Sequence, residues 1–278
     1  MRDSDKREYT KEWIQTERAQ PMYDDSLESF NNKEPIEQLS IKTKDAFYKW
    51  VLNSKRNTFT GFDAFPIHEL CLGCTHYIDD LYIQYGKNNL GIFEGDYSYH
   101  KRLNPKIQFA TLKTIQQYDA ILISLPFSKY ADIHPDLNQI LNICYKGGIP
   151  VHIDCAWFAH IKDITFDFYH PAIETFCISL SKAGMNFNRI ALRFCRKEEP
   201  TSAITILNQA NMLHKELLIK TLDYFTTYKP DYFWDTYEKS YYKICKDFDL
   251  KPTKIISLAK QNEKLVGIRP LLRCIIKK

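Results

Sequence analysis

The segments PVHIDCA (150–156) and SLSKAGMNFNR (179–189) decide the fold of this 278-residue chain. The first is a buried-type apolar run that carries Asp154 near its end, and the second places Lys182 and Arg189 after another such run. Open α/β sheets bind ligands beyond the carboxyl ends of their strands, so we expect Asp154 and Lys182 at one such site. A lysine held there out of water can become nucleophilic, and a nearby aspartate can pair with a cationic ring nitrogen.

Strand-like and helical segments alternate around this pair. The run YDAILISLP (118–126) is continuously apolar, as in a parallel strand that is covered on both faces. A helical pattern follows at 134–148, and further strand-like runs occupy 172–181 and 188–195. Strands separated by crossover helices predict an α/β fold with a parallel or mostly parallel sheet.

The chain divides into three predicted parts. Residues 1–40 form an N-terminal arm with one short helix around Lys6–Arg18, and residues 41–200 form a large α/β domain. After Pro200 the pattern changes to helices, so residues 201–278 are predicted to be a C-terminal domain. Its last segment, KLVGIRPLLRCII (264–276), is expected to form one or two strands.

Composition excludes several classes of protein. The 38 basic and 34 acidic residues give a net charge of +4 that is spread along the chain, so nucleic acid is not an expected partner. No apolar run approaches the roughly 18 residues that span a membrane, and the charged start MRDSDKREYTKEW lacks the apolar centre of a secretory signal. Most of the eight cysteines lie in apolar stretches, which favours reduced thiols and a cytoplasmic location.

A turn at Gly73 introduces a helical segment in LCLGCTHYIDDLY. Backbone N–H groups at Gly73, Cys74 and Thr75, together with the helix dipole, can form a phosphate site there. Glycine is scarce, at 9 residues of 278, so a phosphate loop has few other places to form.

The same segment also invites a zinc hypothesis. His68, Cys71, Cys74 and His76 fall within nine residues and are all possible zinc ligands. Structural zinc sites usually draw ligand pairs from two separated knuckles, and no second pair is evident. We therefore expect Cys71 and Cys74 to be packed thiols and predict no metal.

Taken in order, these motifs resemble the fold-type I pyridoxal-phosphate (PLP) enzymes of the aspartate-aminotransferase-like superfamily, over roughly Ile67 to Cys195. The resemblance implies a three-layer α/β/α large domain with a mostly parallel sheet and a reduced small domain. It implies that Lys182 forms a Schiff base with the cofactor pyridoxal 5'-phosphate and later moves the substrate's α-proton. Asp154 would hold the ring nitrogen protonated, and Ser179 and Arg189 would bind the phosphate.

The resemblance assigns further cofactor-binding and substrate-binding positions. Gly73, Cys74 and Thr75 would hold the phosphate, Tyr97 would stack on the ring, and His100 would support the ring-binding aspartate. Trp157 stands where a tyrosine is usual, and Arg269, with Arg273 as the alternative, would bind the substrate carboxylate.

The sequence also departs from the family pattern. The asparagine of an Asn-Pro pair that bonds the ring hydroxyl should fall near Leu125-Pro126 and is absent. The spacing from Lys182 to Arg189 is one residue short, and Asn188 replaces the usual glycine.

The predicted function is that of a PLP-dependent transferase, an aminotransferase that acts on an amino acid or keto acid as a homodimer. The same site supports decarboxylation, racemisation and β-elimination, and the motifs do not choose among these reactions. A non-catalytic or scaffold protein with a decayed PLP fold is the alternative.

Overall fold

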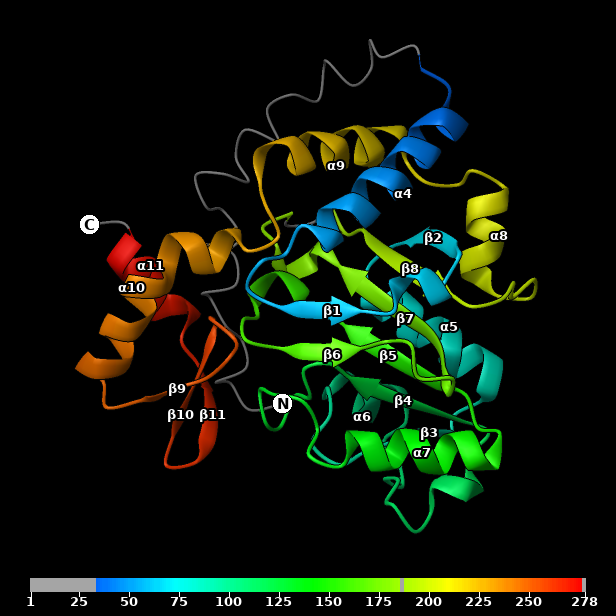
Figure 1. The fold of residues 1–278 in the computed structure, drawn as a ribbon, viewed down its shortest axis with the longest axis horizontal. Helices are drawn as coiled ribbons and strands as arrows, with labels where there is room; N and C mark the ends of the chain where they lie inside the picture. The colour runs from blue at the N-terminus through cyan, green and yellow to red at the C-terminus, as the bar shows by residue number, and fades with distance from the viewer. Residues whose placement is uncertain (1–33, 186–187, 277–278) are drawn as a thin grey trace.

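The computed structural model describes residues 34–185 and 188–276, with side chains up to residue 272. The predicted arm helix at Lys6–Arg18 lies outside the described residues. The chain alternates between helices and strands along most of its length (Figure 1). None of the helices in the described part of the chain combines the length and apolar character that crossing a bilayer requires.

A six-stranded sheet forms the centre of the structure, with the strand order β2-β8-β7-β5-β4-β3. Strands β3, β4, β5 and β7 pair in parallel, whereas β8 pairs antiparallel with both β7 and β2. The prediction of a mostly parallel sheet is therefore confirmed. The strands are β2 (Ile67–Cys71), β3 (Leu90–Ile92), β4 (Ala120–Ser124), β5 (Val151–Cys155), β7 (Ile173–Ser179) and β8 (Ala191–Cys195).

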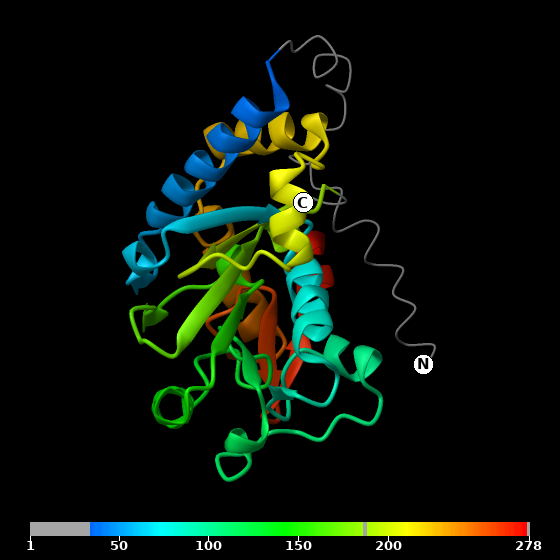
Figure 2. The ribbon, with the colours of Figure 1, turned by 90° about the vertical axis from the view of Figure 1, so that its right-hand side faces the viewer.

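Helices cover both faces of this sheet. Helices α5 and α8 lie on one side and α4 and α7 on the other when the sheet is seen along its edge (Figure 2). The main helices are α4 (Ile36–Leu52), α5 (Cys74–Tyr85), α6 (Tyr99–Leu103), α7 (Leu137–Gly147), α8 (Ala203–Gln209), α9 (Lys215–Thr227), α10 (Tyr232–Asp247) and α11 (Arg269–Ile276).

Two cores result from the alternation of side chains along the buried strands. In β4, Ala120 and Leu122 belong to the core under α5, whereas Ile121 and Ile123 belong to the larger core on the other face. A strand with apolar residues on both faces needs cover on both faces, which is why the run is continuously apolar. The predicted three-layer α/β/α arrangement is therefore confirmed.

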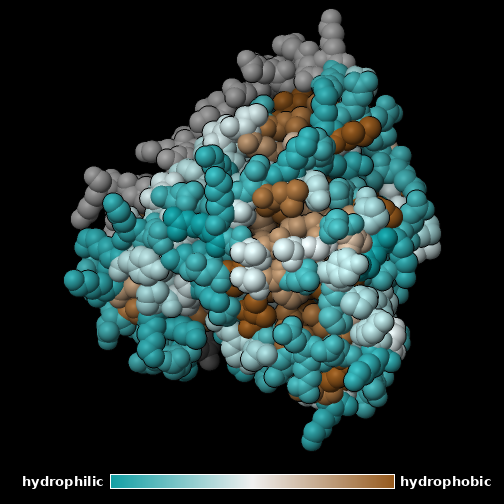
Figure 3. All heavy atoms as spheres, viewed as in Figure 1, coloured by the Kyte–Doolittle hydropathy of each residue, from teal (hydrophilic) through white to brown (hydrophobic). Residues whose placement is uncertain are grey.

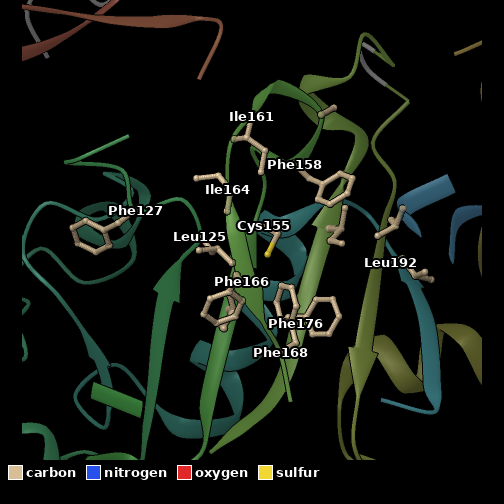
Figure 4. Packing of buried hydrophobic residues seen from close by; sticks show 14 of the residues in the cluster. Leu125, Phe127, Cys155, Phe158, Ile161, Ile164, Phe166, Phe168, Phe176 and Leu192 are labelled. Atoms are coloured by element: carbon tan, nitrogen blue, oxygen red, sulfur yellow. The ribbon is translucent and has the colours of Figure 1, made fainter. Parts of the chain in front are cut away.

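The larger core is rich in phenylalanine (Figure 4). The ring of Phe176 stacks on Phe194 with centroids 4.3 Å apart and on Phe168 with centroids 4.2 Å apart. Phe168 follows β6 (Thr165–Asp167), which pairs in parallel with β1 (Thr58–Thr60). The stack therefore attaches the two-stranded sheet of β1 and β6 to the six-stranded sheet. On the face seen in Figure 3, hydrophobic residues gather in the middle of a mostly hydrophilic surface.

A buried ion cluster attaches β8 to its neighbours. The guanidinium of Arg193, with no exposed surface, bonds Glu69 of β2 and Glu199, the latter at 2.8 Å. It also donates to Ser202 Oγ at 2.9 Å, just before α8 begins. Because a buried charge is tolerated only with partners, this cluster fixes β8 relative to α8.

The C-terminal segment differs from the prediction. Residues 264–276 were expected to be strands, but only β11 (Lys264–Gly267) is one, and α11 begins at Arg269. Pro270 lies in the first turn of α11, a position where proline costs no hydrogen bond. Strand β11 forms a small antiparallel sheet with β10 (Leu258–Gln261) and β9 (Lys251–Pro252).

The domain boundary predicted at residue 200 stays a prediction. Helix α8 packs on β2, where the Asn208 amide exchanges hydrogen bonds of 2.8 and 2.9 Å with the backbone of Leu70. Helix α9 packs on α4. Helix α10 contacts both α11 and strand β9 of the small sheet, and these elements lie together beside the six-stranded sheet and its helices (Figure 1).

Candidate active site

A cavity of about 310 Å³ lies at the carboxyl ends of β4, β5 and β7. This volume is at the lower end of the range for small-molecule sites. The cavity contains most of the residues that the sequence singled out. It is lined by Cys74, Thr75, Asp96, Tyr97, Ser98, Ser124, Ser128, Asp154, Ala156, Trp157, Ser179, Ser181, Lys182 and Arg189.

One end of the cavity gathers hydrogen-bond donors from Gly73, Thr75, Ser179, Ser181 and Arg189, a group that we call the anion cradle. Gly73, with a φ of +87°, precedes α5, and a Cβ added to it would lie 3.0 Å from Ser181 Oγ and 3.4 Å from Arg189 Nε. The Arg189 guanidinium donates to Thr75 Oγ1 at 2.8 Å, and the hydroxyls of Ser179 and Ser181 are 2.7 Å apart. A helix N-terminus, hydroxyls and a guanidinium thus converge, which is the donor set that a phosphate requires.

Asp154 occupies the floor of the cavity near the end of β5. Its side chain is only 4% exposed, and Oδ1 accepts a hydrogen bond of 2.8 Å from the backbone N–H of Ala156. Burial raises the pKa of Asp154, and the Cys74 thiol, the Ala156 N–H and the charge of Lys182 offset this only in part. Because burial makes the charged form of Asp154 unfavourable, a cationic group placed beside the carboxylate would stabilise that charged form.

Lys182 ends the 3₁₀ turn η5 (Leu180–Lys182) that follows β7. Its Nζ lies 4.1 Å from the centre of the Trp157 ring. Burial and then the charge of Arg269 lower the pKa of Lys182 to about 8, against the opposing effect of Asp154. A usable fraction of this side chain is therefore the free amine near neutral pH, as a nucleophile or proton acceptor requires.

Aromatic rings form two walls of the cavity. Tyr97 lines it from the loop after β3 and stacks on Tyr99 with centroids 5.9 Å apart. Trp157 lines it from the turn after β5, and both Lys182 and Arg269 contact its ring, with the Arg269 Cζ 5.6 Å from the ring centre. Arg269 therefore stands next to the cavity without lining it, and the side chain of Arg273 lies outside the described residues.

His100 is the predicted site residue that lies apart from the cavity. Its buried ring places Nδ1 3.3 Å from the Tyr82 hydroxyl, so its hydrogen-bond partner is this tyrosine and not Asp154. Burial lowers the pKa of His100 to about 4, which keeps the ring neutral.

Five polar residues that line the cavity were not assigned by the sequence reasoning, namely Asp96, Ser98, Ser124, Ser128 and Ser181. Asp96 directly precedes Tyr97, and Ser124 ends the apolar run of β4. The signal that identified Asp154, a polar side chain at the end of a buried strand, applies equally to Ser124 and could have found it.

The zinc hypothesis finds no support in the described part of the chain, where no group of three or more histidine, cysteine or acidic side chains could hold a metal. His68 stacks on Tyr48 with centroids 4.7 Å apart, and His76 Nδ1 accepts from the backbone N–H of Leu72 at 3.2 Å. Cys71 and Cys74 are buried, as expected of packed thiols, and both are free.

No protein-family model and no curated protein matches the sequence. Solved structures match the fold. Tyrosine aminotransferase from Leishmania infantum aligns with 88% of this chain and 77% of its own at 10% identity and a TM-score of 0.60. Alanine aminotransferase from Pyrococcus furiosus aligns with 88% and 72% at 11% identity and a TM-score of 0.59. This chain has the fold of the fold-type I PLP-dependent enzymes.

The same fold also appears in a protein with a different reaction. A PLP-bound C-S lyase from Staphylococcus hominis aligns with 82% of this chain and 65% of its own, at 15% identity and a TM-score of 0.58. The chain therefore spans between about two thirds and three quarters of the length of these three proteins.

Proposed function

We propose that this protein is a PLP-dependent transferase that acts on an amino acid and works as an aminotransferase. The observation that carries the proposal is the meeting of Lys182, Asp154 and the Arg189–Thr75 anion cradle in one cavity. PLP has an aldehyde, a basic ring nitrogen and a phosphate. The cavity offers the Lys182 amine for the aldehyde, the Asp154 carboxylate for the ring nitrogen and the anion cradle for the phosphate.

The residues present fit this cofactor. Gly73, Thr75, Ser179 and Arg189 would hold its phosphate, because the space that a Cβ at Gly73 would fill is bordered by Arg189 and Ser181. Asp154 would pair with the ring nitrogen, which supplies the cationic partner that this buried carboxylate favours.

Bound PLP supplies an electron sink for a bond broken at the substrate's α-carbon. The chain supplies the other steps. The Tyr97 ring would cover the cofactor, and the Lys182 amine, with its lowered pKa, would take and return the substrate's α-proton. Arg269, next to Trp157 at the edge of the cavity, would bind the substrate carboxylate.

A C-S lyase reaction is the second candidate, because the solved structures with this fold include a PLP-bound C-S lyase. Both reactions begin with loss of the same α-proton, so Lys182 and Asp154 would serve either. Purified protein assayed against a panel of amino acids, with and without a keto acid, separates them. Transamination consumes the keto acid, whereas C-S cleavage releases a thiol.

A non-catalytic protein with the same fold is the remaining alternative. It gives no physical reason to keep a lysine with a lowered pKa beside a buried carboxylate. A homodimer and a cytoplasmic location are also parts of our proposal. Sedimentation at micromolar concentration showing only a 32.8 kDa species would count against the dimer.

The decisive experiment is borohydride reduction of the protein after incubation with PLP, followed by peptide mapping. We expect the cofactor to be fixed on the peptide that contains Lys182. Lys162 is the matched control, because its Nζ also lies over a tryptophan ring, 4.5 Å from the centre of Trp234. Lys182→Ala should abolish the label and Lys162→Ala should keep it, whereas label on any other lysine would refute the assignment.

A further inference from the structure

A second carboxylate lines the cavity, and the proposed function gives it no role. Asp96 lies in the loop between β3 and α6. The sheet order β8-β7-β5-β4-β3 puts it on the side of Asp154 that is away from Lys182 and Arg189. The cavity thus carries its cations at one end and an additional carboxylate at the other.

Hydrogen bonds hold Asp96 against Ser124. Asp96 Oδ2 accepts from the backbone N–H of Ser124 at 3.0 Å, and Oδ1 accepts both from the Ser124 hydroxyl and, at 2.6 Å, from the backbone N–H of Tyr97. Three donors therefore fix the carboxylate beside the Ser124 side chain, which itself lines the cavity.

Ser124 and Asp154 lie side by side on one face of the sheet. They are register partners in the parallel pair β4–β5, and Asp154 is in turn the partner of Cys177 in β7. Two residues beyond Cys177, on the same face, comes Ser179 at the anion cradle. Along the sheet edge the order is therefore phosphate cradle, Asp154, Ser124 and Asp96.

This order matches the arrangement of polar groups around the PLP ring. The ring hydroxyl and the phosphate-bearing carbon flank the aldehyde carbon on opposite sides, and the nitrogen lies across the ring from the aldehyde. A ring with its phosphate in the cradle and its nitrogen at Asp154 turns its hydroxyl away from the cradle. That direction is toward the end of β4, where Ser124 lies.

The family resemblance assigns two other positions to this region, Leu125 and Trp157, and both are poorer hydrogen-bond partners for the ring hydroxyl than Ser124. Leu125 is 1% exposed and belongs to the core on the opposite face of the sheet. Trp157 has only an N–H that can donate, whereas a serine hydroxyl both donates and accepts. We infer that Ser124 binds the ring hydroxyl of PLP and that Asp96 is the positioning residue that holds Ser124 in place; this inference rests on the proposed function.

The charge of Asp96 gives the inference a spectroscopic signature. Burial raises the pKa of Asp96 to about 6 despite its three donors, so the group is ionised at higher pH. An ionised carboxylate one hydroxyl away from the bound cofactor favours the protonated form of its chromophore. Five other titratable or charged groups line the cavity with Asp96, namely Cys74, Tyr97, Asp154, Lys182 and Arg189. Outside the cavity, the charge of Asp96 acts on Tyr82, and Lys129 lies against the preceding residue Gly95.

The test is a pH titration of the visible absorbance of the PLP-loaded protein, together with the PLP dissociation constant. Asp96→Asn should lower the pH midpoint of the absorbance change by about one unit, because the negative charge is removed. Ser124→Ala should raise the dissociation constant about three- to tenfold, the usual effect of one hydrogen bond. Ser128→Ala is the matched control, because Ser128 also lines the cavity, and it should change neither value.

Unchanged midpoint and affinity in both variants would overturn the inference, while PLP bound to the wild type would leave the proposed function standing. A wild type that binds no PLP at Lys182 would refute the proposed function and this inference with it. Should Asp96→Asn fail to fold, Ser124→Ala decides alone, because it keeps the backbone bonds of Ser124 and Tyr97 to Asp96.

Discussion

Replacing Gly73 by alanine should weaken PLP binding at least tenfold. Gly73 has a φ of +87° and a ψ of 167°, a conformation that is essentially restricted to glycine and costs other residues about 1–3 kcal/mol. The added Cβ would lie 3.0 Å from Ser181 Oγ and 3.4 Å from Arg189 Nε, at or inside the 3.4 Å limit of ordinary contact. The methyl group therefore occupies the anion cradle and displaces its donors.

Gly86 provides the matched control. It ends α5 with a φ of +80° and a ψ of 162°, nearly the conformation of Gly73, but a Cβ there would meet nothing within 4 Å. Both alanine variants should lose similar unfolding free energy, about 1–3 kcal/mol, because the backbone strain is the same. Only Gly73→Ala should lose cofactor affinity.

The assay is a PLP titration of each purified apo-protein, with thermal unfolding measured on the same samples. A tenfold rise in the dissociation constant corresponds to about 1.4 kcal/mol of binding free energy. The reasoning is refuted if Gly73→Ala binds PLP as tightly as the wild type. It is also refuted if Gly86→Ala loses as much affinity, since general destabilisation would then explain both.

Three further predictions concern the other groups of the site. Asp154→Ala should keep part of its PLP affinity but lose turnover by about a hundredfold or more, because the ring nitrogen loses its charged partner; unchanged kinetics would remove Asp154 from the site. Arg189→Ala should raise the PLP dissociation constant by about tenfold or more. Thr75→Ala should raise it by less, because a neutral hydroxyl contributes only about 1 kcal/mol. A titration in which Arg189→Ala binds PLP as tightly as the wild type would contradict this. The pKa of Lys182, lowered to about 8, predicts that the rate of covalent PLP addition rises with pH up to about 8 and then levels off, because only the unprotonated amine attacks; a stopped-flow pH profile with no bend near pH 8 would speak against it.

The buried strands were predictable because their signal is local. The apolar runs at 118–126, 150–156 and 172–181 contain β4, β5 and β7, and each run is apolar on both faces because helices cover the sheet on both sides. Strand β2 was not predicted. Its pairing partner, β8, lies more than a hundred residues further along the chain, and no pattern in the short segment Ile67–Cys71 reports that pairing.

The predicted site rested on the order of motifs, and this order identifies residues at or just beyond the carboxyl ends of β5 and β7. Asp154, Ser179 and Lys182 are of this kind, and the structure brings them into one cavity. Asp96 ends the short apolar segment GIFEGD (91–96), but β3 is a strand of only three residues, and so short a segment does not single out its last residue as part of a site. His100 was assigned by its spacing from Tyr97 alone, and the short helix α6 turns it toward Tyr82 instead.

The short spacing between Lys182 and Arg189 does not move Arg189 away from the anion cradle, because strand pairing and not loop length sets its position. Strands β7 and β8 are antiparallel, with Ser179 opposite Ala191, and the backbone bond of 3.0 Å from Leu180 N–H to the Ile190 carbonyl extends this register by one residue. Arg189 directly precedes Ile190, and Ser181 directly follows Leu180. Arg189 and Ser181 both border the space above Gly73, because a Cβ added to Gly73 would lie 3.4 Å from Arg189 Nε and 3.0 Å from Ser181 Oγ. A residue lost between two paired antiparallel strands shortens the connection and leaves the register unchanged, since a slip would turn every side chain of β8 to the wrong face. The buried Arg193, four residues after Arg189 and bonded to Glu69, holds β8 in that register, so the ion cluster that fixes the strand also fixes the position of the cradle's guanidinium.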